Sequence, residues 1–288
     1  MKKIHLSAAS GVLLCLFHGV AVGQGHDGPS FSGDVTGRYD DNVTRAESDA
    51  DIEEDFVGSL LARVELVKKI NATSGFIFSG SAEGEKYAEF EELDNINIKG
   101  TVSYKLHTGF GFFAPRLSFD ASVNTRSYVN EQRSGNGYEL ATQLTRRMGE
   151  SLTLNGGLRY RNFSADSEVF SVEDTSAFIN ADLLVSPRIA LYSTFRFITG
   201  DVVSTAQPTL NIINASDAIE ADEAFGGFAT NRFVYRLEAD TITVVLGGNY
   251  AFDSRSSVDA SLLYIDTEAE GDIYYARTQY RISYLRRF

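Results

Sequence analysis

Side chains suited to acid–base catalysis are scarce in this sequence. It contains four histidines, and imidazole is the side chain best placed for proton transfer near neutral pH. Only His26 and His107 lie beyond the apolar N-terminal run, one close to the N-terminus and one beside the turn-like pair Thr108-Gly109. We expect both to be solvated loop residues, so no catalytic residue is assigned and the chain is not expected to be an enzyme. Two isolated histidines and the single cysteine, Cys15, also predict no metal site and no cofactor.

Anion binding is the chemistry that the basic residues could perform. Many of them occupy alternate positions within strand-like stretches, where they would share one face. The candidates for the lining of an interior are Lys99, Lys105, Arg116, Arg126, Arg159, Arg161, Arg196, Arg277 and Arg281. Fewer acids share that face, namely Asp120, Glu139, Asp182 and Asp259. A basic lining would favour anions over cations, whereas arginines paired with acids across a narrow interior would close it, and both possibilities remain open.

Alternation of apolar and polar side chains is what would position these residues. In the final stretch, 272–288, Tyr274, Tyr280, Ile282 and Tyr284 share one face, and the cationic Arg277 and Arg281 share the other. Similar stretches recur along the chain. The expected strands are 31–40, 56–67, 73–84, 96–106, 113–126, 138–147, 152–161, 175–185, 188–200, 231–252, 257–266 and 272–288. Pro115 should lie near a strand start or a bulge, because proline lacks the N–H group that a ladder needs.

Long acidic connections alternate with short ones between these strands. That rhythm is typical of transmembrane barrels with short periplasmic turns, long extracellular loops and an even number of strands. The phase of the apolar residues shifts within 231–252, so this stretch is either one strand with a bulge near Ala239-Asp240 or two strands. The segment 201–230 is expected to be the longest irregular one. A soluble β-sandwich with one wet face is the rival architecture.

The N-terminus predicts a secretory signal peptide at 1–23, with Lys2 and Lys3 before an apolar run. A retained membrane anchor is the alternative, which the short run and the polar sequence after it disfavour. Residues 24–30 would form a periplasmic segment and 31–288 the barrel. Without Lys2 and Lys3 there are 24 basic against 39 acidic residues, a net charge of −15. This excess argues against nucleic-acid binding, which requires a basic face.

Carboxylates gather in the long connections, for example at 49–55, 89–92 and 217–223. They could bind divalent cations or bridge through cations to anionic lipopolysaccharide. They could equally form a solvated surface that resists aggregation, and none has the spacing of a calcium loop.

The end of the chain resembles bacterial outer-membrane β-barrel proteins. Tyr280, Ile282, Tyr284 and Phe288 match the alternating aromatic and aliphatic signal, ending in phenylalanine, that the outer-membrane assembly machinery reads in that family; Arg286 departs from it. The resemblance implies an all-β, antiparallel, transmembrane up-and-down barrel of about twelve strands, in a range of roughly ten to fourteen. It also implies location in the outer membrane of a Gram-negative bacterium, with outer-membrane lipid, lipopolysaccharide and the barrel assembly machinery as partners. In such a barrel the last strand closes against the first, so Arg277 and Arg281 should meet Asp34 and Arg38 across this seam.

A second, shorter resemblance lies at Tyr39-Asp40-Asp41-Asn42-Val43-Thr44-Arg45. It looks like the Tyr-Asp-Asp/Ser-Asn-aliphatic-x-Arg stretch of barrel porins encoded with exopolysaccharide genes, although Thr44 stands where an aromatic is frequent. The match implies a porin-like duct or a role in polysaccharide export. The same residues would also make a simple strand-end turn in which Asp and Asn cap the loop backbone.

The expected function is a small porin-like channel, or a conduit for anionic solutes or polysaccharide, with a basic lumen. The alternative is a closed structural or adhesion barrel whose acidic loops contact lipopolysaccharide or surface polysaccharide.

Overall fold

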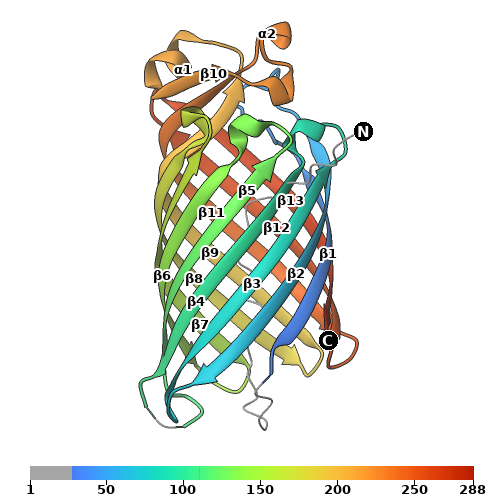
Figure 1. Cartoon of the computed structure of the whole chain (residues 1–288), viewed down its shortest axis with the longest axis vertical. Helices are drawn as coiled ribbons and strands as arrows, with labels where there is room; N and C mark the ends of the chain where they lie inside the picture. Colours follow the sequence, from blue (N-terminus) through green and yellow to red (C-terminus); the bar gives the residue numbers. More distant parts are fainter. Residues whose placement is uncertain (1–27, 110) are drawn as a thin grey trace.

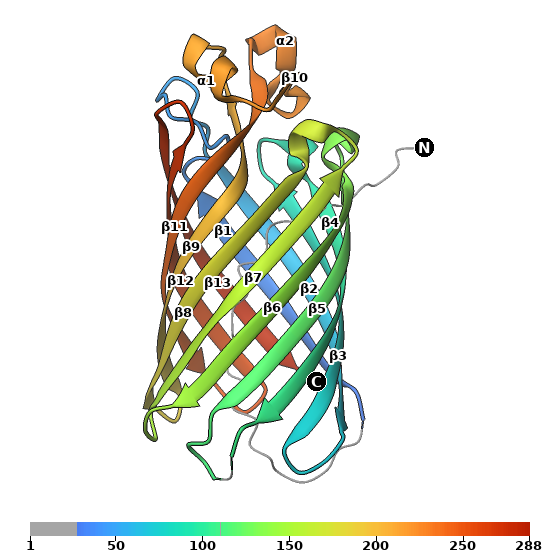
Figure 2. The same ribbon diagram turned by 90° about the vertical axis from the view of Figure 1, so that its left-hand side faces the viewer.

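The computed structural model describes residues 28–109 and 111–288. The predicted signal peptide at 1–23, His26 and most of the predicted periplasmic segment lie outside these described residues. Twelve antiparallel strands close into one barrel, as the alternation predicts (Figures 1 and 2). They are β1 (Ser30–Asp40), β2 (Asp55–Lys69), β3 (Ser74–Tyr87), β4 (Asn95–His107), β5 (Arg116–Tyr128), β6 (Gly135–Arg147), β7 (Leu152–Ala165), β8 (Val172–Ser186), β9 (Ile189–Ala206), β11 (Phe233–Ala251), β12 (Ser256–Ala269) and β13 (Ile273–Arg287).

Neighbours in sequence are neighbours in the sheet, and β13 pairs with β1 to close it. The closing register sets Arg38 opposite Arg281 and Tyr39 opposite Tyr280. Closure leaves no free edge, which a β-structure in lipid requires because its backbone groups find no water there. No helix among the described residues is long and apolar enough to cross a membrane.

Large apolar side chains cover the outside of the barrel. Leu60, Ile98, Val123 and Ile282, from four different strands, are 63%, 61%, 65% and 61% exposed. Soluble monomers rarely expose a continuous apolar surface of this kind, whereas a transmembrane barrel turns it to the lipid. The apolar exterior therefore excludes the soluble sandwich, and the fold is that of an outer-membrane β-barrel of Gram-negative bacteria.

The two ends of the barrel differ. Short connections and the C-terminus gather at one end, here called the inner rim, and the longer loops at the other, here called the outer rim (Figure 1). At the outer rim lie the short helices η1 (Glu91–Leu93), η2 (Glu131–Arg133), η3 (Glu168–Phe170), α1 (Leu210–Ala215), η4 (Glu223–Phe225) and α2 (Gly227–Thr230), and the four-residue strand β10 (Ala218–Ala221). By the usual asymmetry of these barrels, the outer rim faces the cell exterior.

The expected bulge near Ala239-Asp240 is absent, because β11 pairs continuously with both β9 and β12 without a shift of register. The phase of its apolar residues changes for another reason. In the lower part of β11, Ile242 and Leu246 face outward to lipid, while Tyr235 and Leu237 in the upper part are fully buried and face inward. The upper part of β11 lies at the outer rim, where loops cover its inner face.

Two further boundaries differ from the sequence prediction. The segment 201–230 is only partly irregular, since β9 continues to Ala206 and the segment contains α1 and β10. Glu85, which lies just beyond the expected strand 73–84, belongs to β3 and is buried. Pro115 does lie directly before β5, where it interrupts no pairing.

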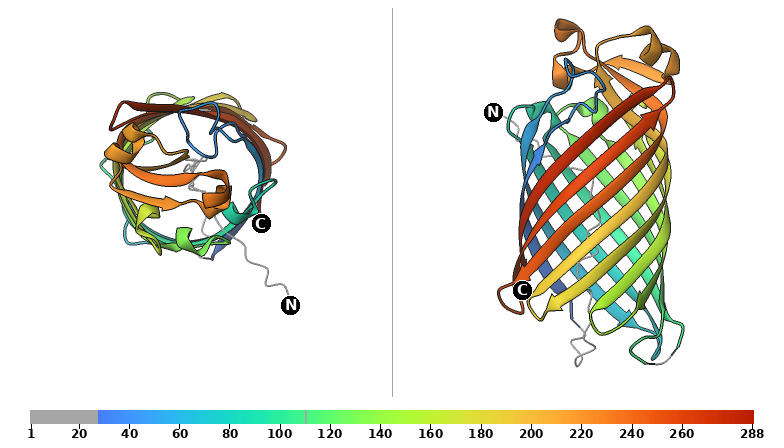
Figure 3. Two further views of the ribbon diagram at one scale, coloured as in Figure 1. Left: turned by 90° about the horizontal axis from the view of Figure 1, so that it is seen from above. Right: turned by 180° about the vertical axis from the view of Figure 1, so that it is seen from behind.

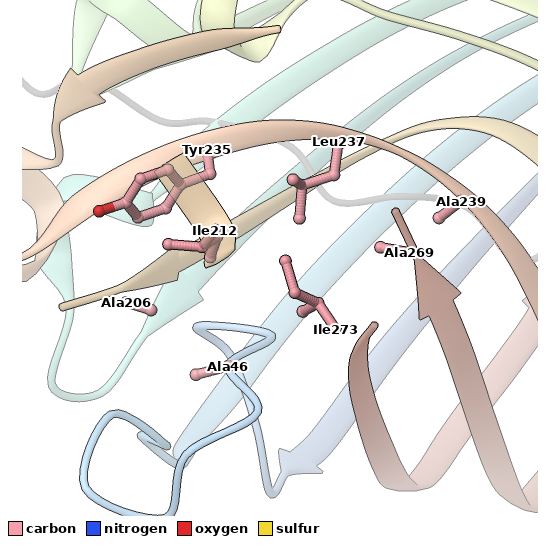
Figure 4. Packing of buried hydrophobic residues seen from close by; sticks show 8 residues of the cluster. All are labelled: Ala46, Ala206, Ile212, Tyr235, Leu237, Ala239, Ala269 and Ile273. Carbon is pink, nitrogen blue, oxygen red and sulfur yellow. The ribbon is translucent and has the colours of Figure 1, made fainter. Parts of the chain in front are cut away.

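A small apolar core at the outer rim explains why the apolar side chains in the upper part of β11 face inward. Figure 4 shows Ala46 and Ile212, from two different loops, beside Tyr235, Leu237 and Ile273 of the strands. Burying a side chain of this size stabilises a fold by about 1.5–3 kcal/mol. Apolar burial therefore holds loops against the inside of the barrel at this end.

Candidate functional site

The barrel encloses a cavity of about 460 Å³ to which all twelve barrel strands contribute side chains. Inward positions alternate with the apolar outward ones, so the lining is set by strand register. Its charged members are eleven bases and six acids, a formal excess of five positive charges. The whole chain carries −13. Bases therefore outnumber acids among the charged residues of the cavity lining, whereas acids outnumber bases in the whole chain.

Seven of the nine basic residues expected to line the interior do so, namely Lys99, Arg126, Arg159, Arg161, Arg196, Arg277 and Arg281. The remaining two, Lys105 and Arg116, lie toward the inner rim on β4 and β5, outside the lining of the cavity. Of the four acids expected on this face, Glu139 lines the cavity, and Asp120, Asp182 and Asp259 do not.

Four basic residues of the lining, Arg38, Arg45, Arg63 and Arg133, were not among the candidates. The alternation of β2 places Arg63 opposite the outward Leu60 and Val64, so the signal for it was present in the sequence. Arg45 and Arg133 come from loops, where no alternation indicates which side chains turn inward.

Part of the basic charge is neutralised inside the barrel. Arg38 donates from both terminal nitrogens to the two oxygens of Glu85, at 3.1 and 3.3 Å. Arg161 Nε donates to Asp174 Oδ2 at 2.6 Å. Glu139 is shared between Lys99 and Arg159, at 3.6 and 3.5 Å. Each of these three acids is thus paired with a base, and the bases remain in excess among the charged residues of the lining.

Among the cavity arginines predicted from the sequence, three have no carboxylate ion-pair partner in the described part of the chain. Arg281 Nη2 donates to the amide oxygen of Gln279 at 2.5 Å. Arg126 donates to Tyr128 Oη at 3.2 Å and lies over the Phe163 ring. Arg196 lies over the Phe178 ring, 5.9 Å from its centroid. Neutral acceptors and aromatic faces attract these cations without cancelling their charge.

Where β13 meets β1, the two arginines of the last strand have different surroundings. Arg277 forms a two-point ion pair with Asp40, in which Nε and Oδ1 are 2.8 Å apart, and Gln279 donates to the same carboxylate. Arg281 faces Arg38 directly, as the alternation predicts. The expected meeting with Asp34 is wrong, because the closing register pairs Asp34 with Leu285, nearer the inner rim. Arg277 therefore joins the last strand to the first, and its charge is neutralised by Asp40. Arg281 has no such partner among the described residues, so its positive charge remains in the cavity.

Two loops lie across the outer end of the barrel, as the view from above shows (Figure 3, left). We call residues 41–54, between β1 and β2, the inward loop, and residues 207–232, between β9 and β11, the lid. The lid is attached to other loops around the rim. Asp222 accepts from Arg133 at 2.6 Å, Glu220 accepts from Gln132 at 2.5 Å and also from Ser167, and Arg232 pairs with Glu53 at 2.7 Å.

Apolar contacts reinforce this attachment. Phe225 of the lid packs on Phe90 with 4.7 Å between ring centroids, and Leu93 joins the same buried cluster. On the other side, Ala218 of the lid packs against the buried cluster of Val169, Phe170 and Val234 beside η3. The lid is thus held by the loops on three sides of the rim.

Several carboxylates of the acidic loops have structural partners. Asp55 accepts from the backbone N–H groups of Phe56, Ala88 and Phe90, at 2.6, 3.1 and 3.1 Å. Asp94 accepts from Lys86 and from the backbone of Tyr87. Among residues 28–109 and 111–288, no cluster of three or more His, Cys, Asp or Glu side chains is arranged to hold a metal ion. These acids order the loops.

His107 is the only histidine of the described part of the chain. It ends β4 at the inner rim, where its side chain is exposed. It lies outside the cavity lining and at the opposite end of the barrel from the lid.

No family model matches this chain, and no curated protein matches it in sequence. Solved structures match its fold. An outer-membrane channel from Pseudomonas putida F1 superimposes with a TM-score of 0.60 at 10% identity, over 90% of this chain and 95% of that one. The KdgM porin gives 0.42 at 12% identity, over 88% and 99%, and the NanC porin 0.46 at 11%, over 88% and 98%. At these identities the likeness concerns the fold, which is an outer-membrane barrel.

Proposed function

We propose that this protein is an outer-membrane channel for small anionic solutes. The observation that carries the proposal is the formal excess of five positive charges in the cavity lining of a chain whose own charge is −13. Fixed cations lining a narrow aqueous path lower the barrier for anions and raise it for cations. The solved barrel from Pseudomonas putida with the same fold is also described as an outer-membrane channel.

Small solutes suit the geometry better than a polymer. The cavity measures about 460 Å³, the size of a pocket for a compact ligand. The lid and the inward loop lie over its outer end (Figure 3). Export of a polysaccharide chain, which the motif at Tyr39–Arg45 implies, would require both loops to move aside.

The attachment of the lid supports a second candidate, a closed structural or adhesion barrel. Asp222 is fully buried and the aromatic contact of Phe225 with Phe90 lies at the rim. In this alternative the lid stays closed, and the outer loops contact lipopolysaccharide or surface polysaccharide.

Planar-bilayer recording distinguishes the two candidates. The purified barrel, shown to be folded by its heat-dependent gel mobility, is recorded under a tenfold KCl gradient. We expect discrete conductance steps and a reversal potential of the sign set by chloride. A double variant, Arg196→Gln with Arg281→Gln, should lose much of this anion preference, while Arg188→Gln, in an exposed turn at the inner rim, should retain it. A folded barrel without conductance, or with cation preference, would overturn the channel proposal.

A further inference from the structure

The inward loop is built by the short motif at the end of β1. Asn42 uses its whole side-chain amide within this loop and the neighbouring strand. Its Nδ2 donates to the backbone oxygens of Ala46 and Ala276, at 2.9 and 3.0 Å, and its Oδ1 accepts from Ala46 N and Thr44 Oγ1, at 3.0 and 3.1 Å. An amide offers two donor hydrogens and one acceptor oxygen. Asn42 is therefore fully satisfied and ties the loop to β13.

Thr44 ties the same loop to itself and to β9. The single hydrogen of its hydroxyl is shared between Asn42 Oδ1 and Asp51 O, the latter 2.9 Å from Oγ1. Oγ1 also accepts from Glu53 N at 3.2 Å, and the Thr44 backbone oxygen accepts from Thr205 N at 2.8 Å. Thr44 is 2% exposed and Ala46 is 1% exposed. The loop is thus a packed part of the barrel interior, whereas an ordinary strand-end turn would lie in solvent.

Arg45 lies between these two anchored residues in a left-handed backbone conformation, with φ of 57°. Only a few per cent of non-glycine residues adopt positive φ. The conformation is held by Ser204, whose Oγ donates to Arg45 O at 2.7 Å. The guanidinium donates to Val203 O at 3.3 Å, and the side chain lines the cavity. The fold thus holds Arg45 in a strained backbone conformation, which places its side chain at the outer end of the lumen.

The charges around Arg45 leave it without a counter-ion. Arg133 and Arg277 are its cationic neighbours, and each has its own acid, Asp222 and Asp40. The phenols of Tyr128 and Tyr275 line the same cavity and interact electrostatically with Arg45, and no carboxylate of the described residues pairs with Arg45. Burial lowers its pKa, as expected for a cation removed from water without a partner.

We propose that Arg45 is the specificity-determining residue of the lumen, which binds the carboxylate of an anionic solute at the outer end of the cavity, and that Asn42 is the residue that positions it. An arginine fork matches a carboxylate in shape and charge. The tyrosines beside it offer the flat, amphipathic surface that suits the remainder of a small organic acid. This inference rests on the channel function proposed above and names the chemical group that the channel recognises.

The test is block of the chloride current by a small carboxylate. Glucuronate is titrated against single channels in 0.1 M KCl, where screening reaches only about 10 Å, with glucose as the uncharged comparison. The variants are Arg45→Asn, which removes the charge while keeping a residue that tolerates positive φ, and Arg45→Lys, which keeps the charge. Arg188→Asn is the matched control at the inner rim.

We expect Arg45→Asn to weaken glucuronate block by about tenfold or more, since a charge-assisted hydrogen bond is lost. Arg45→Lys should restore part of the block, and Arg188→Asn and the response to glucose should be unchanged. Asn42→Ala should weaken glucuronate block in a folded barrel whose chloride preference persists, because the charge is still present but no longer held in place.

Equal glucuronate block in Arg45→Asn and in the native chain would overturn the inference while leaving the channel function standing. Block by glucose equal to that by glucuronate would overturn it as well. A native barrel that never conducts would instead refute the channel function itself, so the two failures are distinct. Heat-dependent gel mobility of each variant establishes that the loss of block is measured on a folded barrel.

Discussion

Arg133, at the end of η2, donates to the fully buried carboxylate of Asp222 in the lid, with Nη2 and Oδ2 2.6 Å apart. Thr205 of β9 donates to the same oxygen at 2.5 Å, and the other oxygen accepts from the backbone of Ala224. One carboxylate thus joins the lid to η2 and to β9. Because Arg133 also lines the cavity, this contact joins the lid directly to a residue of the cavity lining.

Removing that carboxylate should open the lid. Asp222→Ala leaves the Arg133 cation and the Thr205 hydroxyl without their acceptor, and breaking a buried pair from one side costs about 3–5 kcal/mol. A loss of about 3 kcal/mol would raise the open population by roughly a hundredfold. We expect a larger mean conductance and faster proteolysis within 207–232. Asp217→Asn, at an exposed position of the same loop, is the control, and unchanged conductance in a folded Asp222→Ala barrel would contradict a gating role.

The ion pair between Asp40 and Arg277 should stabilise the closure of the barrel. Asp40 is fully buried and accepts from Arg277 and Gln279, so Asp40→Asn leaves a buried arginine without its counter-charge. We expect the free energy of unfolding to fall by about 3 kcal/mol, measured by urea titration in lipid vesicles. Asp217→Asn should leave the transition within about 0.5 kcal/mol of the native value. A seam variant as stable as the native barrel would show that the pair contributes specificity without stability.

Substitution by arginine should destabilise the barrel to different extents at two neighbouring residues of β2, because their side chains point to opposite sides of the barrel wall. Leu60 faces outward and is 63% exposed, whereas Ser59 lines the cavity. Leu60→Arg places a cation in the lipid face at a cost of about 2–4 kcal/mol near the membrane midplane. Ser59→Arg keeps its charge in the lumen and should cost much less. Urea titrations of the two variants in vesicles compare them directly, and equal costs would argue against a lipid-facing exterior at Leu60.

The outward face of β13 should govern assembly in cells. Tyr280, Ile282 and Phe288 are 57%, 61% and 73% exposed on the outside of the barrel, where an assembly factor could contact them before the barrel enters the membrane. Phe288→Ala should lower the amount of protein in the outer-membrane fraction several-fold. Leu285→Ala, which changes an inward-facing residue of the same strand, should lower it less. Equal yields of Phe288→Ala and the native chain would remove Phe288 from the signal.

Features that depend on local repetition could be predicted from the sequence. Strand number, the outward face of each strand and seven of the nine expected basic residues of the lining follow from a period of two, because each residue's side is decided by its neighbours. The same rule predicts that Arg281 lies beside Arg38 once the last strand closes on the first. The alternation rule fails in β11, because apolar residues of this strand face inward at the outer rim.

The sequence by itself determined a closed barrel with an apolar exterior, and it identified most of the basic residues that line the cavity, since both patterns depend on alternation between adjacent residues. Only the tertiary structure decided that the inward loop and the lid fold over the lumen, that Asp222 meets Arg133, and that Arg45 reaches the cavity without an acid. These contacts join residues far apart in the chain, such as Arg45 and Ser204. Their geometry depends on which loops meet after the twelve strands have closed into a barrel. The alternation of side chains along a strand carries no information about such contacts.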